Sequence, residues 1–193
     1  MSEVAYTEHS KVRRVAKRAS YEKSKIYQLV DDLRLGHVGF VVNNRPVVIP
    51  LTVWRGDDHL YLHVANKSRI QRLIESGGEV SISFAEYQEW VMSKSAYHHS
   101  ANYRSAVLYC TGSRVNDDVE FDRAFEVIIN QIEEGRWDNV RSPNKLERKA
   151  TALMKMTINE GSFKARTGGP IEEPEDLSLP VWNGTKPVCP YHP

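Results

Sequence analysis

Cysteine is scarce in this sequence: only Cys110 and Cys189 occur among 193 residues, and no CxxC spacing is present. A disulfide scaffold and a structural zinc site therefore have too few ligands. No apolar run approaches the roughly 20 residues that a membrane-spanning helix needs. The N-terminal residues also lack the apolar stretch of a secretion signal. We expect a protein of a reducing compartment, the cytoplasm, with no membrane association.

Excess charge of either sign is also lacking, because 26 Lys and Arg stand against 25 Asp and Glu. No whole-molecule field can hold a nucleic acid, so we expect no such partner and only local anion binding. Hydrophobic residues make up 40% of the chain, as in ordinary globular proteins. We expect a leader over residues 1–20, one domain over 21–167, and an irregular arm over 168–193 that packs on the domain or on a dimer partner.

The hydrophobic pattern alternates between helical and strand periods. Helical spacing, with Pro143 as a helix start, predicts helices over residues 21–33, 67–75, 117–132 and 143–150. Short β-branched runs separated by turn residues predict strands over 37–42, 46–54, 60–64, 79–84, 90–96 and 105–115. The strand-like runs 151–158 and 162–165 close the regular part. This order excludes a doubly wound parallel sheet. It predicts an α+β protein with six or seven antiparallel strands, closed into a small barrel with flanking helices.

A first candidate site is the group from Asn66 to Arg69, where a strand is expected to end and a helix to begin. Free backbone N–H groups at the helix start, two cationic side chains and the Ser68 hydroxyl would suit a phosphate. The same residues are also typical of a plain helix start, with Asn66 or Ser68 as the N-cap. From the residues alone, both interpretations stay open.

A second candidate is the polar stretch 97–104, which has no clean period and precedes a strongly apolar strand. Such a stretch is expected to be a loop that binds a ligand or pairs across an interface. His98 and His99 are poor joint metal ligands, because neighbouring residues on an extended segment point to opposite faces.

Near the C-terminus, Lys164 and Arg166 are typical of an edge strand whose charges prevent pairing with another chain. Trp182 is expected to pack the irregular C-terminal arm against the domain. Cys189 and His192 form one potential metal-ligand pair without further partners, so we expect no metal site. No Ser-His-Asp order, glycine-rich nucleotide loop, HExxH or paired-carboxylate signature occurs, so catalytic residues are not identified.

The motifs taken in order resemble one family, the pyridoxamine 5′-phosphate oxidase-like flavin-nucleotide-binding proteins, in the branch with the nitroimidazole-resistance reductases. The resemblance spans about residues 13–187. The segments that carry it are Gly36 to Phe40, Pro46 to Pro50, Leu60 to His63, His98 to Val107, Gly135 to Trp137, Lys164 to Arg166, Gly168 to Pro170 and Pro180 to Gly184.

This resemblance implies a split β-barrel that forms a homodimer, with FMN bound in the two clefts between subunits. It places one strand along the flavin ring, His63 near that ring, a basic corner on the phosphate, and later residues in contact with the cofactor or the dimer partner. The implied cofactor-binding residues are Val48, Ile49, Pro50, Leu51, Thr52, His63, Lys67, Ser68, Arg69, Asn102, Tyr103, Arg104, Ser105, Arg166 and Trp182.

The function that this resemblance implies is FMN-dependent oxidation or reduction of a small molecule, with a reduced nicotinamide as a candidate electron donor. The alternative is a carrier of flavin or haem without turnover, or a haem-degrading protein. A haem iron would take His63, His98 or His99 as its ligand.

Overall fold

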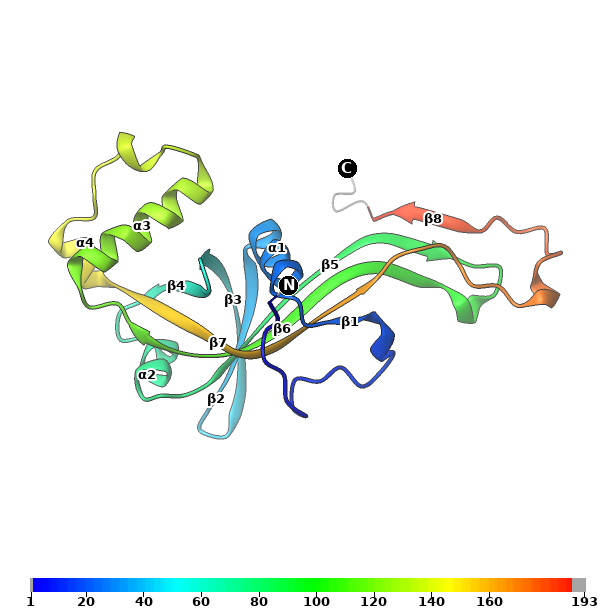
Figure 1. Ribbon diagram of the computed structural model, residues 1–193, viewed down its shortest axis with the longest axis horizontal. Helices are drawn as coiled ribbons and strands as arrows, with labels where there is room; N and C mark the ends of the chain where they lie inside the picture. Colours follow the sequence, from blue (N-terminus) through cyan, green and yellow to red (C-terminus); the bar gives the residue numbers. More distant parts are fainter. Residues whose placement is uncertain (1, 189–193) are drawn as a thin grey trace.

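Six antiparallel strands close into a barrel in the computed structural model, which describes residues 2–188 (Figure 1). The strands are paired in the order β7-β4-β3-β2-β5-β6, and β6 also pairs with β7. Two short strands are added at the edges, β1 to β7 and β8 to β5. The bounds are β1 Ala19–Ser20, β2 Leu35–Val42, β3 Arg45–Gly56, β4 His59–Ala65, β5 Val80–Met92, β6 Ser100–Arg114, β7 Thr151–Arg166 and β8 Gly184–Pro187. The predicted fold class is confirmed.

Four α-helices flank the barrel, close to where their patterns predict them: α1 Lys23–Leu33, α2 Arg69–Glu75, α3 Asp118–Ile132 and α4 Lys145–Ala150. In α3, the Asp117 side chain accepts a hydrogen bond from the Glu120 N–H, so Asp117 is the N-cap of the helix. In α4 the N-cap is Asn144. The sequence predicted that Pro143 opens the helix, but in the structure Pro143 precedes the N-cap. Short 3₁₀ turns occupy Ala16–Arg18, Ala96–His98, Trp137–Asn139 and Pro174–Asp176.

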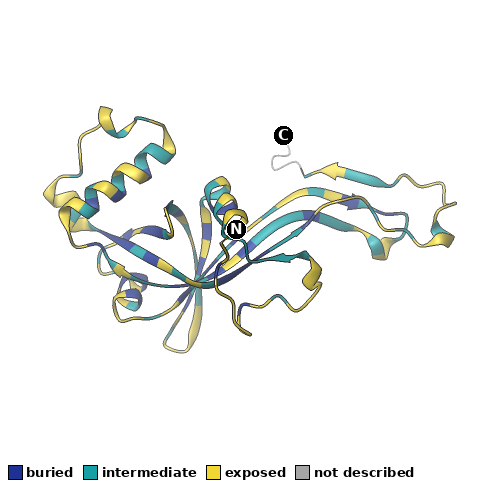
Figure 2. Cartoon of the chain, in the orientation of Figure 1, coloured by how far each residue is buried: buried dark blue, intermediate teal, exposed yellow. Residues whose placement is uncertain are grey.

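The main core fills the barrel and extends under α1 (Figure 2). Leu60, Leu62 and Leu108 are fully buried inside it. A second, smaller cluster lies where α3 covers the outside of β4 and β7, with Tyr61 and Phe121 among its members. One side of β4 therefore faces the barrel core and the other faces α3.

Three strands are longer than the sequence predicts. Residues 79–84 and 90–96 were expected as two strands but belong largely to the continuous β5, and β7 runs unbroken through 151–166. The predicted loop at 97–104 is also wrong, because β6 begins at Ser100. The far parts of β5, β6 and β7 extend beyond the barrel as one long curved structure (Figure 1). We call this extension the arm from here on, and residues 168–188 the C-terminal segment. In the arm, the apolar alternation that marks a half-buried strand is lost, and a register shift between Tyr87 and Glu89 interrupts it further.

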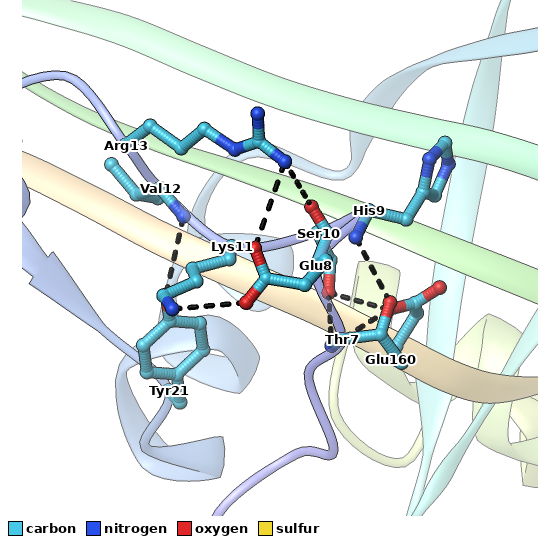
Figure 3. A network of polar contacts seen from close by, with 9 residues as sticks. All are labelled: Thr7, Glu8, His9, Ser10, Lys11, Val12, Arg13, Tyr21 and Glu160. Carbon is cyan, nitrogen blue, oxygen red and sulfur yellow. Dashed lines mark hydrogen bonds and ion pairs between the residues drawn. The ribbon is translucent and has the colours of Figure 1, made fainter.

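The N-terminal segment is fastened to the barrel through Glu160 of β7 (Figure 3). The Ser10 hydroxyl donates to the Glu160 carboxylate at 2.6 Å, and the Thr7 N–H donates to the same carboxylate at 3.0 Å. Val4 is buried, and the Gly161 N–H donates to the Ala5 carbonyl at 3.1 Å. This segment is thus part of the folded unit rather than only a solvated leader.

The C-terminal segment returns along the arm and is not wholly irregular, because β8 pairs with β5. Glu172 holds it there, accepting hydrogen bonds from the Ser93 hydroxyl at 2.8 Å and the Asn183 amide at 3.0 Å. The candidate metal pair Cys189 and His192 lies outside the described residues. Within residues 2–188, no helix combines the length and the apolar character that a membrane crossing requires.

Candidate functional site

The barrel is split between β3 and β4. These strands pair only from Val53 to Gly56 on β3 and from His59 to Leu62 on β4. Beyond that point β3 continues with β2 alone, and β4 continues with β7. Within the described residues, the first half of β3 therefore has a strand partner on one edge only.

The open edge of β3 presents backbone groups that could bind a planar polar ligand. The Val53 N–H donates toward β2, to the Arg34 carbonyl at 2.7 Å. Because backbone groups alternate between the two edges of a strand, those of Thr52 point to the open edge. Pro50 has the same direction, so its missing N–H costs no bond to β2. Of the predicted residues here, Val48, Pro50 and Thr52 are exposed, whereas Ile49 and Leu51 pack against the core.

His63 lies on the outer face of β4, next to the split. Its ring contacts Phe125 of α3 edge-on, with 5.5 Å between ring centroids. The His63 side chain is still exposed, and its partial desolvation lowers its pKa, which favours a neutral imidazole at pH 7. No hydrogen bond to its ring nitrogens occurs among residues 2–188, so a nitrogen is available to a ligand.

The predicted phosphate corner lies at the end of β4. Lys67 and Arg69 are exposed, and within the described chain neither forms an ion pair. The Ser68 hydroxyl accepts from the Gln71 N–H at 3.3 Å, so Ser68 is the N-cap of α2. The Lys67 N–H is bonded to the side chains of Asn66 and Gln71. The corner therefore offers the side chains of Lys67 and Arg69 to an anion. The backbone N–H groups of Lys67 and Gln71, which the sequence suggested for a phosphate, already donate to protein side chains.

Sequence reasoning missed a third cation at this corner. Arg114, at the end of β6, donates to the Asn66 side chain at 3.2 Å and to the Thr151 carbonyl at 3.3 Å. The Asn66 amide in turn donates to the Lys149 carbonyl at 3.0 Å. Arg114 reaches this corner because β6 pairs with β7. No local sequence pattern predicts that pairing.

The predicted residues 102–105 do not converge on one site, because they alternate between two faces of β6. Asn102 is buried and donates to Glu89 at 2.6 Å. Arg104 donates to Asp32 at 2.8 Å and to Glu86. Tyr103 and Ser105 line a cavity of about 500 Å³ on the arm, together with Ala85, Glu86, Tyr87, Ser100 and Ala101.

Arg166 and Trp182 also lie on the arm side of the molecule. Arg166 is only 7% exposed and donates to Asn102, to the Gly168 carbonyl at 3.0 Å and to the Gly169 carbonyl at 2.8 Å. Trp182 is 64% exposed, so burial does not anchor the C-terminal segment there.

The two histidines near the tip of the arm are already engaged. His98 Nε2 lies 3.4 Å from Glu173, and His99 Nδ1 lies 3.0 Å from the Ser95 carbonyl. No group of three or more metal-ligating side chains occurs within residues 2–188.

Two sets of the predicted residues lie at opposite ends of β7: Lys67 and Arg69 at the basic corner, and Tyr103 and Arg166 on the arm. Ala65, beside the basic corner, pairs with Thr151, whereas Tyr103 on the arm pairs with Arg166. At about 3.3 Å per residue, these ends are separated by about 50 Å of strand. A ligand held by Lys67 and Arg69 therefore cannot also touch Tyr103 or Arg166 of the same chain.

Comparison with protein families gives one match, a family model described as pyridoxamine 5′-phosphate oxidase, over residues 22–165. No curated protein sequence matches this chain. Among solved structures, the flavocytochrome Anf3 from Azotobacter vinelandii is 28% identical with a TM-score of 0.86, covering 97% of this chain and 89% of that one.

Two further structures are similar. The FAD and haem binding protein from Mycobacterium smegmatis is 25% identical with a TM-score of 0.82, covering 89% of this chain and 84% of that one. A candidate 5-nitroimidazole antibiotic resistance protein from Bacteroides thetaiotaomicron is 17% identical with a TM-score of 0.64, covering 76% of this chain and 86% of that one. The last similarity concerns the fold alone.

Proposed function

This chain belongs to the pyridoxamine 5′-phosphate oxidase family, and on that premise we propose that it is a flavin-dependent redox protein acting on a small molecule. The observation that carries the proposal is the split between β3 and β4. An open strand edge and His63 flank its mouth, and Lys67 and Arg69 follow at the end of β4. A bound flavin supplies the electron chemistry, while the chain positions it and tunes its charge.

We propose FMN as the flavin. Its ring would lie along Val48 to Thr52, and its single phosphate would meet the side chains of Lys67 and Arg69, with Arg114 behind them. The M. smegmatis relative is described as binding FAD. Chromatography of the flavin released by heat denaturation separates FMN from FAD, and FAD as the only released flavin would contradict this choice.

We further propose a homodimer, because Lys67 and Arg69 at the basic corner and Tyr103 and Arg166 on the arm are too far apart to share a ligand in one chain. A two-fold axis would bring the arm of one copy to the split of the other and create two equivalent sites. Tyr103, Ser105, Arg166 and Trp182 would then act on the partner's cofactor. Light scattering of the flavin-loaded protein should give twice 22.1 kDa, and the mass of one chain would contradict the dimer.

Haem binding is a second candidate. The flavocytochrome from A. vinelandii and the M. smegmatis relative are both described as haem proteins. Of the three histidines that the sequence suggests, only His63 has ring nitrogens without a protein partner in residues 2–188, and its pKa is lowered. His98 and His99 already contact Glu173 and the Ser95 carbonyl.

The absorption spectrum of the purified protein tests both candidates. Flavin gives absorption bands at about 370 and 450 nm, and haem gives a Soret band at about 410 nm. We expect the flavin bands, and a protein that stays colourless after addition of FMN would contradict the proposal. Activity is then measured with a reduced nicotinamide as donor and a panel of small acceptors. Bound flavin without turnover would leave only the carrier function.

A further inference from the structure

A basic cavity of about 560 Å³ lies between the N-terminal segment and the end of β7. Four cationic side chains line it, and no Asp or Glu does: Lys17, Arg18, Lys25 and Arg166. The volume is within the range of small-molecule sites. The cavity belongs to the arm side of β7, at the opposite end of that strand from Lys67 and Arg69.

Within residues 2–188, most of this positive charge is not neutralised by ion pairs. Lys25 pairs with Glu22 at 2.7 Å, but Lys17 and Arg18 have no ion pair among residues 2–188. The buried Arg166 donates to two carbonyls and to the Asn102 side chain. Asn102 in turn donates to the Glu89 carboxylate, so this carboxylate is linked to Arg166 only through Asn102. Burial and the nearby charge of Arg18 both lower the pKa of Arg166. Cations held together in this way favour a bound anion.

The remaining lining indicates what kind of anion fits. Phe163, Ala165 and Ile171 supply apolar surface beside the cations. A free inorganic ion would leave this surface without a partner. A nucleotide combines phosphates for the cations with a planar base for the apolar part. Lys17 is exposed and Arg18 is half-buried, so both can reach a ligand that enters from solvent.

We propose that this cavity binds the phosphates of a nucleotide other than the flavin, with Lys17 and Arg18 as the principal contacts and Arg166 at the back. About 50 Å of strand separates it from the basic corner of the same chain, so one ligand does not fill both sites of that chain. The inference rests on the lining of the cavity in one chain. Because Arg166 would also approach the partner's cofactor in the proposed homodimer, Lys17 and Arg18 are the residues that distinguish this site from the flavin site.

Calorimetric titration of the full chain with ADP and with adenosine tests the proposal, in flavin-free and in FMN-loaded protein. ADP should bind in both states, and adenosine, which lacks phosphates, at least tenfold more weakly. Arg18→Ala should weaken ADP binding about tenfold or more, because it removes a charge-assisted contact. Lys17→Ala should act in the same direction. Arg45→Ala removes an exposed cation from another part of the barrel and should leave ADP binding unchanged.

Several outcomes would overturn the proposal: no ADP binding to the unmodified chain, equal binding of ADP and adenosine, or equal losses in Arg18→Ala and Arg45→Ala. Loss of ADP binding when FMN is loaded would assign the cavity to the flavin instead. FMN binding of each variant, followed by absorbance, reports separately on folding and on the proposed flavin site. ADP binding that depends on Arg18 in a protein without flavin affinity would support the cavity and refute only the flavin proposal.

Discussion

Thr52 and His63 are the first residues beyond the point at which β3 and β4 separate, because Val53 and Leu62 form the last cross-strand pair. Val53 and Leu62 are fully buried, so their chain neighbours Thr52 and His63 face outward. The split thus has one of these residues on each side of its mouth. A ligand that enters the split meets both, although eleven positions separate them in the sequence.

His63→Ala tests whether this histidine binds haem iron or only lies beside the flavin ring. If His63 binds haem iron, the variant loses the Soret band of haem-reconstituted protein, and added imidazole restores it. FMN binding should weaken less than in Arg69→Ala, because the phosphate corner is intact. Absorbance spectra after reconstitution with each cofactor provide the measurement. An unchanged Soret band in His63→Ala would remove His63 as the ligand.

Glu160 makes attachment of the N-terminal segment dependent on pH. Hydrogen bonds from Ser10 and then from Thr7 lower the pKa of Glu160 below its ordinary value of 4.5. The folded pKa is therefore below the unfolded one, so this stabilisation is complete above the unfolded pKa and disappears as pH falls through the folded pKa. Thermal unfolding should show Glu160→Gln less stable than the unmodified chain at pH 7. The difference should shrink below about pH 4. A difference in melting temperature that is independent of pH would contradict this role.

The sequence predicts those elements whose signals are local. The α1 stripe of Ile26, Leu29 and Val30 and the Asp117 cap depend on neighbouring residues, and both are found in the structure. The extent of the arm could not be predicted in this way. It depends on pairing between β6 and β7, whose partners are about 40 to 60 residues apart in the chain. The same pairing brings Arg114 to the corner of Lys67 and Arg69, and it also makes residues 102–105 alternate between two faces.

Ser68 allows the capping and phosphate interpretations of the corner to be separated. Ser68→Ala removes the acceptor of the Gln71 N–H and should lower the free energy of unfolding by about 0.5–2 kcal/mol. Ser68→Asp retains a good N-cap but adds a negative charge between Lys67 and Arg69. It should remain near the unmodified stability while binding FMN more weakly.

Denaturant unfolding and FMN titration of both Ser68 variants provide the comparison. Unchanged FMN affinity in Ser68→Asp would argue that no phosphate binds beside Ser68. Loss of stability in Ser68→Asp equal to that in Ser68→Ala would argue against the cap.

Titration of FMN and riboflavin into the unmodified chain and into Arg69→Ala tests the flavin-phosphate corner directly. Arg69→Ala removes a charge-assisted contact worth about 1.5–3 kcal/mol, which corresponds to about a 10- to 150-fold loss of FMN affinity. Riboflavin has no phosphate, so its binding should be unchanged, and Arg45→Ala should affect neither ligand. Flavin fluorescence follows both titrations. A selective loss for FMN is the predicted result, and an equal loss for both flavins, or no loss for either, would contradict it.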